Sequence, residues 1–182
     1  MEKKILIFGG TGAIGFSIAK NLKNQGYNPI IIARNKEDLI SKSKEINCSY
    51  EICDVLEIDQ IKEIALKHSE NVIGLAYCVG SINLRPLKIT KDQDFIESFK
   101  VNTLGAINAV KMNLQSLTDN NGSILFFSTI AVQQGFTNHS IVSSSKGAVE
   151  GLALSLAAEF APKIKVNCIA PSLTDSKMSQ KM

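Results

Sequence analysis

A glycine-rich turn near the amino terminus is the strongest chemical signal in this sequence. Residues 9–15 read Gly-Gly-Thr-Gly-Ala-Ile-Gly, directly after an apolar run and directly before a helical pattern. Such glycines permit a tight turn and let backbone amides approach a pyrophosphate, which the N-terminus of the following helix attracts. The placement predicts a dinucleotide site. Its expected contacts are Gly9, Thr11, Gly12, Ile14 and Gly15.

The residue after the second expected strand selects the cofactor in a site of this kind. Where NAD is bound, an Asp or Glu usually stands there and binds the ribose 2′-hydroxyl. This sequence reads Ala33-Arg34-Asn35, without a carboxylate, and an arginine can pair with a 2′-phosphate. We therefore predict NADP rather than NAD, with Arg34 as the phosphate contact. The alternative is that Arg34 is a solvated surface charge.

Short apolar runs alternate with longer amphipathic segments along the chain. The runs are almost continuous in Ile, Leu, Val and Phe, which is typical of parallel strands covered by helices on both faces. The expected strands are Lys4–Phe8, Pro29–Ala33, Tyr50–Cys53, Ile73–Val79, Ser123–Ser128 and Lys165–Ile169. The expected helices are Ala13–Gln25, Glu57–His68, Asp94–Leu117 and Ser143–Phe160, with His68 at the surface. This order predicts a three-layer, doubly wound α/β Rossmann fold in a single domain, residues 1–182.

Composition and charge argue against several other classes of protein. Of the 182 residues, 45% are hydrophobic and the net charge is +3, without the basic cluster typical of nucleic-acid binding. The first apolar run is too short to span a membrane, and no signal-peptide pattern follows it. The cysteines, Cys48, Cys53, Cys78 and Cys168, lack metal-site spacing. We expect buried free thiols, no metal, no nucleic-acid or membrane partner, and a cytoplasmic location.

Further motifs resemble the short-chain dehydrogenase/reductase family over nearly the whole chain. The similar segments are Cys53-Asp54-Val55, Tyr77-Cys78-Val79-Gly80 and Asn167-Cys168-Ile169-Ala170-Pro171, each at the end of an expected strand. The resemblance implies that Asp54 bonds the adenine amino group, that Val55 packs on the ring, and that the loop Ser172–Met178 covers the nicotinamide. The cofactor contacts implied in this way are Asp54, Val55, Cys78, Val79, Gly80, Lys146, Pro171 and Thr174.

The catalytic set of this family is a Ser, a Tyr and a Lys four residues after the Tyr. Lys146 matches the Lys and Thr129 stands at the Ser position, whereas Val142 stands at the Tyr position. In the enoyl-acyl-carrier-protein reductases, a divergent branch, the Tyr lies seven residues before the Lys, and His139 holds that place here. Residues 139, 142, 143 and 146 share one helical face, which would put His139 beside Lys146. The alternative is that His139 only caps or precedes the helix.

The resemblance implies an oxidoreductase that transfers hydride between a nicotinamide and a carbonyl or activated C=C of a small molecule. Asn102 resembles the family's helix-borne Asn, so Asn102, Thr129, His139 and Lys146 are the implied catalytic residues. The proton would come from His139 or from a water held by Asn102 and Lys146. A non-catalytic NAD(P)-binding sensor or scaffold is the alternative, favoured by the missing Tyr. Related proteins form homodimers or homotetramers and continue further, so a homo-oligomer and a C-terminally truncated chain are expected.

Overall fold

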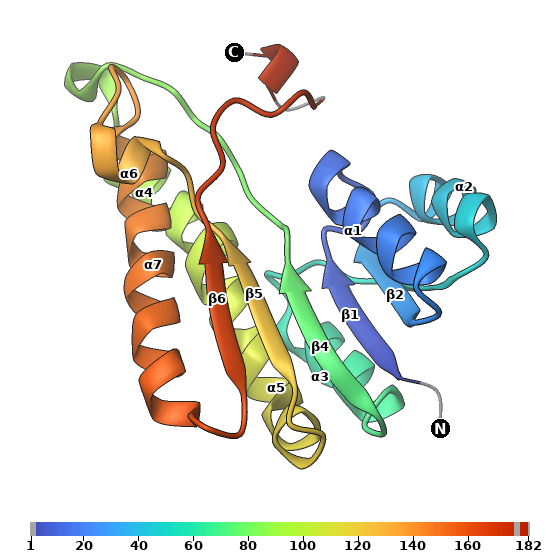
Figure 1. The fold of residues 1–182 in the computed structure, drawn as a ribbon. Helices are drawn as coiled ribbons and strands as arrows, with labels where there is room; N and C mark the ends of the chain where they lie inside the picture. Colours follow the sequence, from blue (N-terminus) through green and yellow to red (C-terminus); the bar gives the residue numbers. More distant parts are fainter. Residues whose placement is uncertain (1–2, 177–178, 182) are drawn as a thin grey trace.

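The computed structural model describes residues 3–176 and 179–181, which form a six-stranded sheet with helices on both faces (Figure 1). The strands are β1 (Lys4–Phe8), β2 (Asn28–Ala33), β3 (Ser49–Ile52), β4 (Val72–Tyr77), β5 (Ser123–Phe127) and β6 (Lys165–Ile169). Every neighbouring pair is parallel, in the order β3-β2-β1-β4-β5-β6. This order reverses direction between β1 and β4, as in doubly wound sheets. The predicted fold class is confirmed.

The helices differ from the prediction in several places. They are α1 (Ala13–Asn24), α2 (Lys36–Ile46), α3 (Ile58–Lys67), α4 (Asp92–Phe99), α5 (Gly105–Asp119), α6 (Ala131–Gln134) and α7 (Ser140–Phe160). The single helix expected over Asp94–Leu117 is wrong, because a π-helical turn, η2 (Lys100–Leu104), joins α4 to α5. Helix α7 begins three residues before the predicted Ser143. Helices α2 and α6 had no predicted bounds, and the short 3₁₀ turns η1 (Leu87–Ile89) and η3 (Ser179–Lys181) were not expected.

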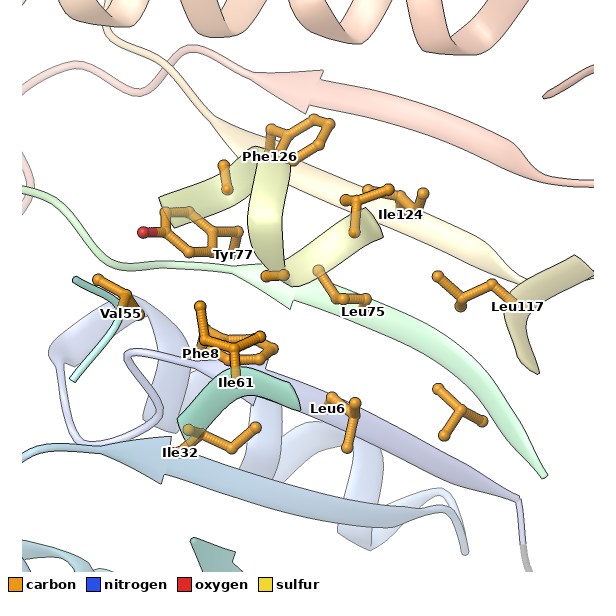
Figure 2. Packing of buried hydrophobic residues seen from close by; sticks show 14 of the residues in the cluster. Leu6, Phe8, Ile32, Val55, Ile61, Leu75, Tyr77, Leu117, Ile124 and Phe126 are labelled. Atoms are coloured by element: carbon orange, nitrogen blue, oxygen red, sulfur yellow. The ribbon is translucent and has the colours of Figure 1, made fainter. Parts of the chain in front are cut away.

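Alternate residues of the central strands fill two apolar layers, one on each face of the sheet. Leu6 and Phe8 point toward the face covered by α3, α5 and α7, whereas Ile5 and Ile7 point toward α1 and α2. Figure 2 shows Leu6 and Phe8 alongside Leu75 and Tyr77 of the next strand. Because successive side chains of a strand point to opposite faces, a continuous apolar run is what a strand between two helical layers requires.

Two expectations about burial are corrected. His68, expected at the surface, is 9% exposed, and its Nε2 lies 2.8 Å from Glu51 Oε1 on β3. Lys67 Nζ lies at the same distance from that oxygen. Burial raises the pKa of Glu51, but hydrogen bonds from Lys67 and His68 outweigh it, so the pKa lies below its usual value. All four cysteines are free as expected, although only Cys53 is fully buried.

No helix in the described part of the chain is both long and apolar enough to cross a lipid bilayer.

Candidate cofactor and active site

A cleft of about 850 Å³ lies at the carboxyl ends of the strands, where the sheet reverses direction. Its lining includes Thr11–Gly15 after β1, Cys78–Ile82 after β4, Phe127–Ile130 at β5, and Pro171–Thr174 after β6. In Figure 1 the segment that follows β6 passes above this edge of the sheet. Ligands of open α/β sheets bind in this crevice, so the topology and the cleft agree on the location of the site.

The glycine turn forms one end of the cleft and has the backbone shape that the sequence predicts. Gly9 has φ +78°, a left-handed conformation that favours glycine, and its N–H donates to the Ile32 carbonyl at 2.8 Å. A Cβ on Gly15 would collide with the Gly9 carbonyl oxygen, so only glycine lets α1 start this close to the turn. Gly12 is the N-cap of α1, and no side chain caps it. The first amides of α1 therefore remain available to an anion at the positive end of the helix.

Lys146 enters the cleft from α7 and is the buried cation of the site. Its side chain is 8% exposed, and Nζ donates to the Phe127 carbonyl at 2.8 Å. Burial lowers the pKa of Lys146 from 10.5 to about 8. Cys78, across the same cleft, has its pKa raised by burial to about 12, so its thiol stays neutral. The ammonium of Lys146 thus has no ionised thiol beside it, and its charge is available to a ligand.

Asn102 sits in the π-helical turn between α4 and α5 and is fully buried. Its Nδ2 donates to the Ser98 carbonyl at 2.9 Å, and its Oδ1 accepts from the Ser81 N–H at 3.2 Å. Tyr77 of β4 donates its hydroxyl to the Val101 carbonyl at 2.6 Å, which ties the same turn to the sheet. π-Helical turns within helices often occur at functional sites. The turn fixes Asn102 against the segment that follows β4, although Asn102 itself does not line the cleft.

Three further candidates, Thr129, His139 and Val142, line the cleft near Lys146. The Thr129 hydroxyl accepts from the Ala131 N–H at 3.3 Å, which leaves its proton free to be donated. Val142 is buried, with 4% exposed. His139 occupies the N-cap position of α7 without a capping bond from its side chain, so it precedes the helix and also faces the cleft.

The predicted contacts of the adenosine moiety lie together at the ends of β2 and β3, outside the cleft lining. Arg34 is largely exposed, and its guanidinium lies 3.7 Å from the Asp54 carboxylate. Val55 is 7% exposed and belongs to the apolar cluster around Tyr77. The roles assigned to these three residues remain predictions.

The other cofactor contacts implied by the resemblance, at the ends of β4 and β6, do line the cleft. They are Cys78, Val79, Gly80, Pro171 and Thr174. The Thr174 hydroxyl donates to the Ser172 carbonyl at 3.2 Å. Of the loop predicted to cover the nicotinamide, residues 177 and 178 lie outside the described residues.

Sequence reasoning missed a buried hydroxyl pair behind the site. Ser98 Oγ of α4 and Ser145 Oγ of α7 lie 2.9 Å apart, and Asn102 Nδ2 lies 3.3 Å from Ser145 Oγ. Thr103 donates to the Ser145 carbonyl at 2.9 Å. These contacts hold the π-helical turn against α7 one residue before Lys146. The signal available in the sequence was a polar Ser145 at a helix position that should face the core, beside Lys146.

Within residues 3–176 and 179–181, no group of three or more His, Cys, Asp or Glu side chains is placed to hold a metal ion.

A parallel sheet in this strand order, with a glycine turn and a helix N-terminus at its reversal point, makes the chain a Rossmann-type α/β protein. The chain belongs to the short chain dehydrogenase family of oxidoreductases, because the family's sequence model matches residues 3–182. The resemblance stated from its motifs is therefore confirmed at the level of the family.

Individual relatives cover almost all of this chain. Carbonyl reductase family member 4 of Xenopus tropicalis is 29% identical over 185 residues, which are 98% of this chain and 78% of that protein. The 3-oxoacyl-(acyl-carrier-protein) reductase of Homo sapiens is 30% identical over 188 residues, 99% of this chain and 79% of that protein. A solved structure described as ElxO with NADP bound is 30% identical, with a TM-score of 0.90, covering 100% of this chain and 77% of its own.

Proposed function

We propose that this protein is an NADP-dependent oxidoreductase that reduces a carbonyl or an activated C=C of a small molecule, or catalyses the reverse oxidation. The observation that carries the proposal is one continuous cleft that joins the glycine turn to Lys146 and Thr129. A similar structure described as NADP-bound, at 30% identity, supports the choice of nucleotide.

The residues of the cleft fit such a dinucleotide. The uncapped N-terminus of α1 would hold the pyrophosphate, and the ammonium of Lys146 would hold hydroxyls of the nicotinamide ribose. Arg34 would leave Asp54 to pair with a 2′-phosphate, and Asp54 and Val55 would contact the adenine. When bound, the nicotinamide supplies or accepts the hydride. Pro171 and Thr174, from the segment after β6, would position its carboxamide.

Side chains of the protein would then orient the substrate oxygen and deliver the proton. The Thr129 hydroxyl would donate a hydrogen bond to the substrate carbonyl and orient it. On reduction, the hydride adds to the carbonyl carbon and a proton must reach the oxygen, which yields the alcohol.

Two proton sources remain, because Val142 has no proton to give. His139 Nδ1 lies 2.8 Å from the Thr137 carbonyl, which can only accept, so Nδ1 carries a hydrogen. A second proton, on Nε2 of the imidazolium, would be the one to transfer. The other source is a water held by Lys146 and by the backbone of Asn102, whose side chain is bonded to Ser98 and Ser81.

The test combines nucleotide titration with a substrate screen on the full-length protein. We expect NADPH to bind more tightly than NADH, and a panel of carbonyl and enoyl compounds to reveal turnover that Lys146→Ala abolishes. Lys62→Ala, at an exposed lysine of α3, is the control and should retain activity. Turnover that persists in His139→Ala assigns the proton to the water. Tight NADPH binding without turnover on any compound replaces this proposal with a nucleotide-binding sensor or scaffold.

We also propose a cytoplasmic homodimer or homotetramer. Ile96, Phe99 and Leu104, along α4 and its π-helical turn, are each about 40% exposed or more, and so is Leu154 on α7. Burial of such side chains against a second copy would stabilise the assembly. The proposal predicts a dimer or tetramer in light scattering that dissociates in Phe99→Glu. A monomeric wild-type protein would contradict it. The free cysteines are consistent with a reducing compartment.

A further inference from the structure

The outer part of the cleft has an apolar rim contributed by three separate segments. Ile82 follows β4, Phe136 lies between α6 and α7, and Leu173 follows β6. These side chains are 40%, 48% and 78% exposed, although all three line the cleft. Single exposed apolar residues are common, but three that converge on one cavity from three loops mark a binding surface.

The rim is continuous with the polar end of the cleft. Val142 lies one helical turn before Lys146 on α7, and His139, at the N-cap of α7, has its ring centre 5.4 Å from that of Phe136 in the rim. Val79 and Thr129 line the same cleft. Two of the rim segments are joined, since the Arg85 N–H donates to the Asn138 carbonyl at 3.1 Å. A ligand whose oxygen meets Thr129 would therefore extend its remaining atoms past Val142 toward the rim.

Charge is placed away from the rim. Arg85, in the loop after β4, is absent from the lining, and its guanidinium lies 3.4 Å from the Asp94 carboxylate. Asp38 and Lys42 line the cleft on α2, where Lys42 Nζ lies 4.0 Å from the centre of the Phe16 ring on α1. Among the described lining residues, His139 is the ionisable group that lies close to Phe136, with ring centres 5.4 Å apart.

From this arrangement we infer that the substrate is an uncharged, largely apolar carbonyl compound, whose apolar body lies between Ile82, Phe136 and Leu173. The inference rests on the proposed function, since it assigns the substrate class of the same cleft. Transfer of apolar surface from water drives the binding, and each methylene that reaches the rim increases the affinity by up to roughly fourfold. A short anionic carbonyl compound gains nothing from this rim.

The test measures the affinity of two neutral ketones and one anionic ketone for the full-length protein. The probes are 2-pentanone, 2-nonanone and acetoacetate. The affinity of each is measured by ligand-observed NMR, with and without saturating NADP⁺. We expect 2-nonanone to bind at least about tenfold more tightly than 2-pentanone. Acetoacetate should bind most weakly. Where turnover is seen, the same order is expected in kcat/KM.

Matched variants separate the rim from unspecific partitioning of a long alkyl chain. Leu173→Ser should reduce the preference for 2-nonanone severalfold, and Ile82→Ser should do the same. Leu66→Ser, at a leucine of α3 that is 68% exposed and outside the cleft, should leave the preference unchanged. Phe136 is left intact because its substitution would also disturb His139.

Three results would overturn the inference: equal affinity for the two neutral ketones, tighter binding of acetoacetate, or an unchanged preference in both rim variants. These failures are distinguishable from failure of the proposed function, because NADPH affinity is measured separately. Normal NADPH binding with a flat ketone series refutes only the apolar rim. A rim-dependent ketone series without any nucleotide binding supports the rim and refutes the NADP-dependent reaction.

Discussion

The buried ammonium of Lys146 is expected to lower the stability of the folded protein. Burial shifts its pKa from 10.5 to about 8. At about 1.36 kcal/mol for each pH unit, the difference corresponds to about 3 kcal/mol at neutral pH. The cost arises because the folded chain holds a charge away from water, with the Phe127 carbonyl as a hydrogen-bond acceptor at 2.8 Å.

Lys146→Met keeps a similar length and removes the charge. We expect the free energy of unfolding at pH 7 to rise by about 2 kcal/mol, since loss of the hydrogen bond to Phe127 offsets about 1 kcal/mol. The folded pKa lies below the unfolded one, so the unfolded wild type binds more protons between pH 8 and 10.5. Wild-type stability therefore rises with pH through that window, and the advantage of the variant shrinks.

The assay is urea denaturation of the nucleotide-free protein at pH 7 and pH 10. Lys62→Met, at an exposed lysine of α3, is the control for titration of other groups and should track the wild type at both pH values. Equal stability of Lys146→Met and wild type at pH 7 would refute the reasoning. An advantage that stays constant up to pH 10 would refute it equally.

Three further predictions follow from other parts of the structure. Arg34→Asp should weaken NADPH binding at least about tenfold and affect NADH binding less, because a charge-assisted contact with the 2′-phosphate is lost. Fluorescence titrations measure both affinities, and an unchanged ratio of NADPH to NADH affinity contradicts the role of Arg34. Gly9→Ala should destabilise by about 2 kcal/mol or more in urea, because φ is +78° and a Cβ would lie 2.8 Å from the Cys78 carbonyl carbon. Gly26→Ala, at φ +84° with nothing within 4 Å, is the control and should cost only about 1 kcal/mol. Glu51→Gln should destabilise by about 1 kcal/mol at pH 7, an effect that fades as the pH falls below 4.5 because the depressed pKa of Glu51 stabilises only the ionised state. A difference that stays constant from pH 7 down to the lowest pH at which the protein remains folded contradicts this account.

The sheet was predictable because its strands are buried on both faces. Two strands, Lys4–Phe8 and Lys165–Ile169, have the bounds that the sequence predicts, and the other four differ by one or two residues at one or both ends. Continuous apolar runs define such strands without knowledge of their partners. The glycine turn was predictable for a similar reason, since its spacing is a local requirement of the backbone.

The helices were less predictable where their partners lie far away in the sequence. Helix α2 has few apolar residues, and of these only Leu39 is fully buried. A local signal for it existed, since the Asn35 side chain accepts from the Asp38 N–H at 2.9 Å as an N-cap. No local signal marks the π-helical turn. Its contact with the sheet is long-range, since the Tyr77 hydroxyl on β4 donates to the Val101 carbonyl within the turn.

In the candidate site, too, local spacing was predictable and long-range contacts were not. Thr129, His139 and Lys146 line one cleft, as their spacing in the sequence predicts, because a strand end and one helix face determine where they point. Their chemical roles stay predictions. The surroundings of Lys146 could not be predicted, since its pKa depends on how deeply the ammonium is buried. His68 was misplaced for the same reason, because Glu51 meets it across 17 positions of the chain.

Buried polar contacts behind the cleft join the π-helical turn to α7, the helix that carries Lys146. Ser145 and Lys146 are adjacent on α7, so one faces Ser98 and Asn102 while the other faces the cleft. A rotation of α7 about its axis would carry the Lys146 ammonium out of the cleft. Hydrogen bonds from Thr103 and Asn102 to Ser145 resist that rotation, because breaking them would leave buried polar atoms unpaired. The polar network thus holds the face of α7 that carries Lys146 toward the cleft.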